Sequence, residues 1–298
     1  MSEAVGFIGV GLMGHGMAKN IVEKGYKLTI LGHRNRAPVE DLVKRGATEA
    51  KSAREVAAAS SIVFLCVTGA AEVEGNVRGP DGLAAGAKKG LIIVDCSTTD
   101  PTSTIALADE LKPQGVTLID APLGGTPAQA EEGKLSAMVG ADAESYARVK
   151  PVIEAWAQSV RHIGPVGDGH KMKLLNNFLA MGYGAIYSEA LAVAQKSGIS
   201  AETFDSVIRG SRMDCGFYQT FFKYVLEGDR NAHQFTLKNA LKDVRYLEAM
   251  ANKAGVANPV GNAVKNTYAA AVNAGRDQDF VPMLSDFVAS ANGVKTKA

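Results

Sequence analysis

Ala4-Val5-Gly6-Phe7-Ile8-Gly9-Val10-Gly11-Leu12-Met13-Gly14 stands near the start of the chain. A short apolar run leads into glycines at positions 9, 11 and 14, and apolar residues at helical spacing follow. This order predicts a strand, a tight turn and a helix, the unit that holds the pyrophosphate of a dinucleotide. An ordinary tight turn is the alternative, because 32 of the 298 residues are glycine. The residues predicted to bind the cofactor here are Gly9, Gly11, Leu12, Met13 and Gly14.

The composition excludes several classes of protein. At 298 residues and 46% hydrophobic content, the chain is long enough for about two domains with real cores. A net charge of +1 gives no reason to expect a nucleic acid or a membrane as a partner. Three scattered cysteines suggest neither a disulfide framework nor a metal site. With a strand starting at about residue 4 and no apolar run of membrane-spanning length, we expect a cytoplasmic protein.

The secondary-structure pattern changes after about Gly164. Before it, β-rich runs alternate with helical patterns, which predicts a largely parallel sheet; after it, long helical stretches follow one another. We therefore predict an α/β Rossmann-like domain over residues 1–164 and an all-α domain over residues 165–298, joined by a long helix at about 170–197. The clearest strands are expected at Val5 to Ile8, Lys27 to Leu31, Ser61 to Cys66, Leu91 to Cys96, Thr117 to Asp120 and Leu135 to Val139. The later helices are expected at Ala201 to Arg209, Leu237 to Ala254, Pro259 to Ala274 and Val281 to Ala291.

The end of the second strand bears on the choice of dinucleotide. NAD sites usually carry an acid there for the ribose 2′-OH, whereas NADP sites carry basic groups for the 2′-phosphate. Here the strand runs into Gly32-His33-Arg34-Asn35-Arg36, with no acid before Glu40. This favours NADP(H) over NAD(H), with His33, Arg34, Asn35 and Arg36 as candidate contacts. Solvated loop arginines are the alternative.

Two further stretches carry polar groups suited to chemistry. The loop from Asp120 to Pro127 follows a strand, and Gly124, Gly125 and Thr126 offer amides and a hydroxyl to a substrate anion. Lys173 and Asn177 are four residues apart and so share a helix face. A lysine there suits proton transfer to a carbonyl oxygen, with the amide orienting the substrate, although most helix lysines are simply solvated.

Together these motifs resemble the β-hydroxyacid dehydrogenase family, which includes 3-hydroxyisobutyrate dehydrogenases and tartronate semialdehyde reductases. The resemblance spans nearly the whole chain in order. It rests on Gly6 to Gly14, Asp95-Cys96-Ser97-Thr98, Asp120-Ala121-Pro122, Gly133 to Gly140, Gly167 to Asn177 and Leu241-Lys242-Asp243.

The resemblance implies a catalytic role for Lys173, an orienting role for Asn177, and assembly as a homodimer or homotetramer. It places Val67, Thr68, Ser97 and Thr98 near the nicotinamide, and Lys242 over the cofactor.

One departure concerns the anion. The common form of the family has a serine where this chain has Gly124, and Arg212 is a candidate replacement contact. The expected activity is hydride transfer between NADP(H) and a small 3-hydroxy acid or its semialdehyde. Reduction of an imine or a sulfonated aldehyde, and a non-catalytic NADPH-binding sensor, are the alternatives.

Overall fold

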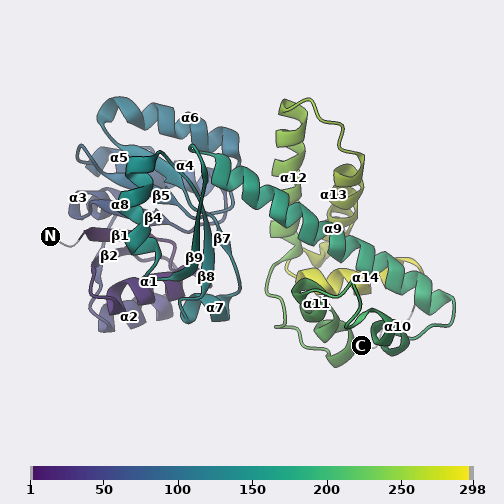
Figure 1. Ribbon diagram of the computed structural model, residues 1–298. Coiled ribbons are helices and arrows are strands. Elements are labelled where there is room, and N and C mark those ends of the chain that lie inside the picture. The colour runs from purple at the N-terminus through teal and green to yellow at the C-terminus, as the bar shows by residue number, and fades with distance from the viewer. Residues whose placement is uncertain (1–2, 295–298) are drawn as a thin grey trace. The chain divides into compact units, whose positions relative to one another are not determined.

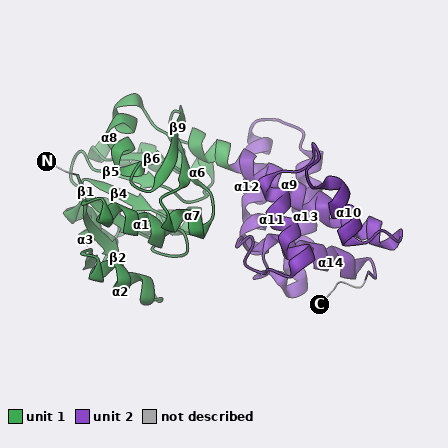
Figure 2. Cartoon of the chain, turned by 60° about the horizontal axis from the view of Figure 1, so that its bottom comes forward, with its two compact units in different colours: residues 1–173 green, residues 174–298 purple. Residues whose placement is uncertain are grey.

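The computed structural model describes residues 3–294. The chain forms two compact units, the first ending at Lys173 and the second beginning at Leu174 (Figure 2). The first unit carries the sheet and the second is helical, as predicted (Figure 1). The last strand ends at Gly164, and the first turn of the long helix after it still belongs to the first unit.

A mixed sheet forms the centre of the first unit. Its described strands are β1 (Ala4–Ile8), β2 (Lys27–Leu31), β3 (Thr48–Ala50), β4 (Ile62–Leu65), β5 (Ile92–Asp95), β6 (Thr117–Asp120), β7 (Leu123–Gly124), β8 (Leu135–Gly140) and β9 (Ala157–Gly164). They lie in the order β3-β2-β1-β4-β5-β6-β8-β7, with β9 also paired to β8. The pairings are parallel except those of β8 with β6 and β7, which are antiparallel.

Helices cover both faces of this sheet (Figure 1). They are α1 (Gly14–Glu23), α2 (Ala37–Lys44), α3 (Ala53–Ala59), α4 (Ala70–Val77), α5 (Leu83–Gly86), α6 (Pro101–Leu111), α7 (Pro127–Glu131) and α8 (Ala143–Ile153). Because neighbouring strand residues point to opposite faces, Phe7 packs in a core with α1, α2 and α8, whereas Ile8 packs in a core with α3, α4 and α6. Burial on both faces explains why these strands read as continuous apolar runs.

The second unit is built from α9 (Asp168–Lys196), which crosses the division between the units, together with α10 (Ala201–Ile208), α11 (Gly216–Glu227), α12 (Leu237–Lys253), α13 (Pro259–Ala271) and α14 (Leu284–Ala291). Its core is aromatic: Tyr218, Phe221, Phe222 and Tyr268 are fully buried. Tyr218 and Phe222 stack with ring centroids 4.3 Å apart. Over residues 3–294, no helix has the length and apolar character needed to cross a membrane.

The predicted strands are confirmed to within one residue at each end, but β3, β7 and β9 were missed. β3 and β7 are too short to give a periodic signal, and β9 is polar because much of it is exposed. The sequence analysis also missed α11 and the antiparallel pairing of β8. Pairing direction depends on how the chain returns to the sheet, which local pattern does not reveal.

The close approach of α1 to α7 provides a test of the packing. A Cβ at Gly16 would lie 2.5 Å from the backbone of Ala130, whereas one at Gly75, in α4, would meet nothing within 4 Å. We expect Gly16→Ala to lower the free energy of unfolding by about 1–3 kcal/mol through overpacking. Gly75→Ala, the matched control, should raise it by about 0.5–1 kcal/mol, since alanine is the better helix former. Urea denaturation of both variants measures this; equal effects would contradict the close packing.

Candidate active site

The carboxyl ends of the central strands are in register with one another. Ile8 pairs with Leu65, Leu65 with Asp95, and Asp95 with Asp120. The residues that follow these four positions therefore lie along one edge of the sheet. Since β2 lies on one side of β1 and β4 on the other, the strand order reverses at β1, and ligands of open α/β sheets bind at such a reversal.

The glycine turn after β1 fits a dinucleotide. Gly9 has a φ of +99°, and a Cβ there or at Gly14 would collide with the backbone carbonyl of Cys66 or of Gly9, respectively. A Cβ at Gly11, by contrast, would meet nothing within 4 Å, so the backbone is open to a ligand there. Among the described residues, no side chain caps α1 and none in its first turn is acidic. The helix N-terminus is therefore suited to accept a pyrophosphate.

The two segments predicted to lie near the nicotinamide are joined at this edge. The Val67 amide donates to the Ser97 hydroxyl at 3.0 Å, and the Ser97 amide donates to the Asp95 carboxylate at 2.9 Å. Ser97 is buried, Val67 and Thr98 are half-buried, and Thr68 is exposed. The structure thus brings Val67 and Ser97 together beside the turn, while their contact with a cofactor stays a prediction.

The segment after β2 holds an ion pair that the sequence analysis missed. His33, Arg34, Asn35 and Arg36 are exposed, and both terminal nitrogens of Arg36 donate to Glu49 at 2.8 Å. These hydrogen bonds hold the pKa of Glu49 below its usual value. Glu49 lies on β3, opposite Ile30, so only strand pairing places this acid at the end of β2.

In the loop predicted to bind the substrate anion, Thr126 already makes hydrogen bonds within the protein. The Thr126 hydroxyl accepts from the Gln129 amide at 3.3 Å, and the Gln129 side chain accepts from the Thr126 amide at 2.9 Å. This capping box begins α7. At Gly124, a Cβ would lie 2.5 Å from the Ser136 hydroxyl, so Ser136 fills the space that a side chain would take. The groups of Thr126 are engaged, which leaves Gly124 and Gly125 as the simpler anion contacts.

A buried carboxylate attaches the start of α9 to the same edge. Asp120 accepts from the amides of Gly167 and His170, both at 2.6 Å. Burial raises the pKa of Asp120 above its ordinary value, although the nearby imidazole and the two amides oppose this rise. Lys173, half-buried, stands three residues after His170 on the same helix. Asp120 therefore fixes the turn from which Lys173 projects.

Two predicted residues meet within the second unit. The Asn177 amide donates to Asp243 at 2.6 Å, and the Lys242 ammonium lies 2.9 Å from the other oxygen of that carboxylate. Asp243 is buried, and Lys242 also lies 5.1 Å from the centre of the Tyr246 ring. Asp243 thus orients both side chains, a role that its place in a sequence motif did not reveal. Arg212 is exposed, on the turn between α10 and α11.

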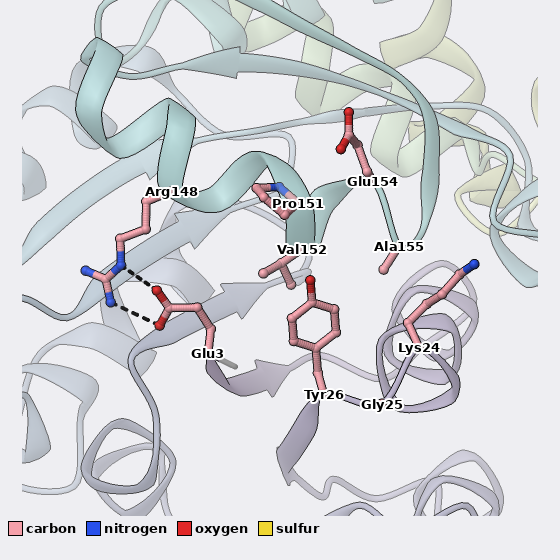
Figure 3. Close-up of a pocket in the computed structure, with 9 residues that line it drawn as sticks. All are labelled: Glu3, Lys24, Gly25, Tyr26, Arg148, Pro151, Val152, Glu154 and Ala155. Carbon is pink, nitrogen blue, oxygen red and sulfur yellow. Dashed lines mark hydrogen bonds and ion pairs between the residues drawn. The ribbon is translucent and has the colours of Figure 1, made fainter. Parts of the chain in front are cut away.

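A pocket with a volume of about 530 Å³ lies at the opposite edge of the sheet. Figure 3 shows the residues that line it. Glu3 and Tyr26, which line it, directly precede β1 and β2. The Arg148 guanidinium donates to Glu3 there, and these hydrogen bonds hold the pKa of Glu3 below its usual value. Because ligands of such folds bind at the carboxyl edge, we assign this pocket no part in the site.

The two thiols near the functional edge, Cys66 and Cys96, have raised pKa values. Burial raises the pKa of Cys66 to about 12 and also raises that of Cys96. Since the thiolate is the nucleophile, neither cysteine suits covalent chemistry.

Comparison with known proteins agrees with this geometry. Residues 4–164 match the family described as the NAD binding domain of 6-phosphogluconate dehydrogenase. Residues 167–286 match the family described as NAD-binding of NADP-dependent 3-hydroxyisobutyrate dehydrogenase. The two matches account for both the glycine turn and the helical unit.

The individual proteins that the chain resembles are dehydrogenases and reductases. The chain is 33% identical over 232 residues to 2-(hydroxymethyl)glutarate dehydrogenase of Eubacterium barkeri, covering 76% of each protein. It is 29% identical over 290 residues to 3-sulfolactaldehyde reductase of Escherichia coli, covering 97% of each. The crystal structure of a 3-hydroxyisobutyrate dehydrogenase from Salmonella typhimurium matches with a TM-score of 0.85 at 25% identity, over 95% of this chain and 99% of that one.

The matches extend over both units, and the glycine turn that they include is the one whose backbone is open to a dinucleotide. The chain therefore belongs to the β-hydroxyacid dehydrogenase family, and it is an oxidoreductase that uses a nicotinamide dinucleotide.

Proposed function

We propose that the chain reduces a small semialdehyde with an anionic end to its 3-hydroxy acid, or catalyses the reverse oxidation, with NADP(H) as the hydride carrier. One observation carries this proposal. The glycine turn, the Val67–Ser97 contact and the start of α9 share one edge of the same sheet, because Asp120 accepts from Gly167 and His170. A hydride donor held by the turn is thereby placed at the edge that also anchors the helix of Lys173.

Lys173 is the proposed general acid. When bound, the nicotinamide supplies the hydride to the carbonyl carbon, and the Lys173 ammonium gives its proton to the carbonyl oxygen. In the oxidative direction, the neutral amine accepts the hydroxyl proton. Asn177, one helical turn further on, orients the substrate, and its own orientation is set by the hydrogen bond to Asp243.

The anionic end of the substrate is proposed to bind at Gly124 and Gly125, with Arg212 as a further contact. Thr126 is less suited to bind the anion, because its amide and hydroxyl already make the hydrogen bonds of the capping box. A carboxylate, or a sulfonate, accepts hydrogen bonds from backbone amides in the same way.

NADP(H) is proposed over NAD(H) on the basis of the segment after β2. Arg34 and Arg36 are exposed there, and a guanidinium can donate two parallel hydrogen bonds to a phosphate. Glu49 opposes this preference, because it pairs with Arg36 in the structure. A 2′-phosphate must therefore exchange with Glu49 or share the guanidinium with it.

Replacement of Lys173 tests the proposed activity. We expect Lys173→Ala to lower kcat for aldehyde reduction by about 10²- to 10⁴-fold while leaving the Kd of NADPH unchanged. Lys171→Ala is the matched control, because Lys171 lies on the same turn but pairs with Asp168 at 2.8 Å. NADPH oxidation followed by absorbance gives kcat, and retained turnover in Lys173→Ala would remove this lysine from the mechanism.

The substrates for this assay are chosen in matched pairs. Malonic semialdehyde, which is reduced to a 3-hydroxy acid, should exceed propanal in kcat/KM by about 10-fold or more, since a charge-assisted hydrogen bond contributes about 1.5–3 kcal/mol. If kcat/KM is higher for a small imine or a sulfonated aldehyde than for the semialdehyde, that compound represents the substrate class and the proposed class is wrong. Tight NADPH binding without any turnover would indicate a sensor instead.

The cofactor preference is tested by binding alone. We expect a lower Kd for NADPH than for NADH, and Arg36→Ala should raise the NADPH value by about 10-fold without changing that of NADH. Glu49→Gln should lower the Kd of NADPH, because it releases Arg36. Arg45→Ala, in the separate pairs with Asp41 and Glu23, is the control. Cofactor fluorescence titration measures these constants; tighter binding of NADH by the native protein would contradict the preference.

We also propose that the chain assembles as a homodimer or homotetramer. Leu175, Leu179, Ile186 and Val193 remain exposed on α9 at spacings of four or seven residues, and exposed apolar stripes of this kind mark interfaces. The mass by light scattering should be a multiple of 31.2 kDa, and Ile186→Glu should lower it. Val207→Glu, an exposed apolar position on α10, is the control. A native mass of 31.2 kDa would contradict the proposal.

A further inference from the structure

His170 is a buried titratable residue that the proposed mechanism does not use. Its side chain is 0% exposed and lies in the first turn of α9. The ring nitrogen Nδ1 lies 2.8 Å from the Thr104 hydroxyl of α6. On its other side, Nε2 lies 3.1 Å from both the Ser97 carbonyl and the Thr99 hydroxyl. One ring therefore joins α6, the segment after β5 and the start of α9.

The partners of the ring hold it in one orientation. The Ser97 carbonyl can only accept, so Nε2 donates to it. The Thr99 hydroxyl, 3.1 Å from Nε2, itself donates to Asp95 at 2.8 Å. The Thr104 hydroxyl, 2.8 Å from Nδ1, also contacts the Asp100 carbonyl at 3.2 Å. Both ring nitrogens are therefore engaged.

Two buried carboxylates face the ring. Asp95 Oδ2 lies 3.8 Å from Nε2, and Asp120 Oδ2 lies 3.8 Å from Nδ1. They lie at the ends of β5 and β6, whereas α6 presents the neutral Thr104. Each carboxylate is itself held by two donors, Asp95 by the Ser97 amide and the Thr99 hydroxyl and Asp120 by the amides of Gly167 and His170. The ring is thus packed among groups whose positions are fixed by other hydrogen bonds.

The same contacts connect two parts of the proposed site. Ser97 is the residue whose hydroxyl accepts from Val67, on the nicotinamide side, and its carbonyl accepts from His170. Lys173 follows His170 by three residues, which is nearly one turn of the helix. Loss of the ring would remove the contact between the first turn of α9 and the segment proposed to lie near the nicotinamide, and would leave that turn held by its main-chain hydrogen bonds to Asp120.

We propose that His170 is a positioning residue, whose ring, held between Thr104 and Ser97, fixes Lys173 relative to the nicotinamide side of the site. The proposal rests on the catalytic role proposed for Lys173. It concerns kcat and the hydride-transfer step rather than cofactor affinity, because the glycine turn is held by other contacts.

His170→Gln tests the proposal in the full-length protein. We expect kcat to fall about 10- to 100-fold, as small misplacements of catalytic groups do, with the Kd of NADPH and the KM of the aldehyde nearly unchanged. The kinetic isotope effect with NADPH deuterated at the transferred position should increase, because hydride transfer becomes more rate-limiting. A smaller folded fraction would lower the rate without changing this isotope effect.

His162→Gln is the matched control, since that histidine lies on β9, where its ring contacts the Ala141 carbonyl and stacks on Tyr146. It should leave kcat and the isotope effect unchanged. Native values of both in His170→Gln would overturn the proposal. If Lys173→Ala loses turnover while His170→Gln keeps it, only the positioning role fails; if Lys173→Ala keeps turnover, the catalytic role proposed for Lys173 fails, whatever His170→Gln does.

Thr104 gives a second test should His170→Gln fail to fold. Thr104→Val removes the hydroxyl that hydrogen-bonds to His170 Nδ1 but keeps the side-chain shape. We therefore expect kcat to fall and the isotope effect to rise. Thr104→Ser keeps the hydroxyl and should restore both towards native values. Equal behaviour of the two variants would overturn the proposal.

Discussion

Two carboxylates, Asp95 and Asp120, are buried side by side at the carboxyl ends of β5 and β6, and the functional edge of the first unit depends on how they are compensated. Leaving a carboxylate unpaired in a protein interior is costly, so each must collect donors from whatever segments lie nearby. Asp95 accepts hydrogen bonds from the Ser97 amide and the Thr99 hydroxyl, and Asp120 accepts hydrogen bonds from two backbone amides at the start of α9. Compensation of charge thereby determines the positions of the loops that form the site.

The second unit repeats this arrangement on a smaller scale. Asp243 is buried, and it collects the Asn177 amide and the Lys242 ammonium. In the second unit the carboxylate holds two side chains with proposed roles, whereas in the first unit the carboxylates hold the backbone of the segments from which such side chains project. Such residues tie the stability of the fold to the geometry of catalysis, because removing one leaves unpaired groups on its partners.

The segment after β2 shows how neighbouring strands alter a conclusion drawn from a linear motif. Five consecutive residues without an acid, Gly32 to Arg36, favour a 2′-phosphate. Strand β3 brings Glu49 to the same place and pairs it with Arg36 through two hydrogen bonds of 2.8 Å. The preference for a dinucleotide therefore depends on a competition between Glu49 and the phosphate for one guanidinium.

The sequence by itself determined the alternation of strands and helices, the glycine turn and the change to an all-helical second half, because these depend on local periodicity and on backbone freedom at single residues. It also placed Lys173 and Asn177 on one helix face. Only the tertiary structure decided that β8 runs antiparallel to β6, that Glu49 meets Arg36, and that Asp243 joins Asn177 to Lys242. The burial of His170 between Asp95 and Asp120 likewise required the fold, since 75 residues separate His170 from the more distant of them. Contacts of this kind depend on which chain segments pack together, and no local pattern in the sequence records that.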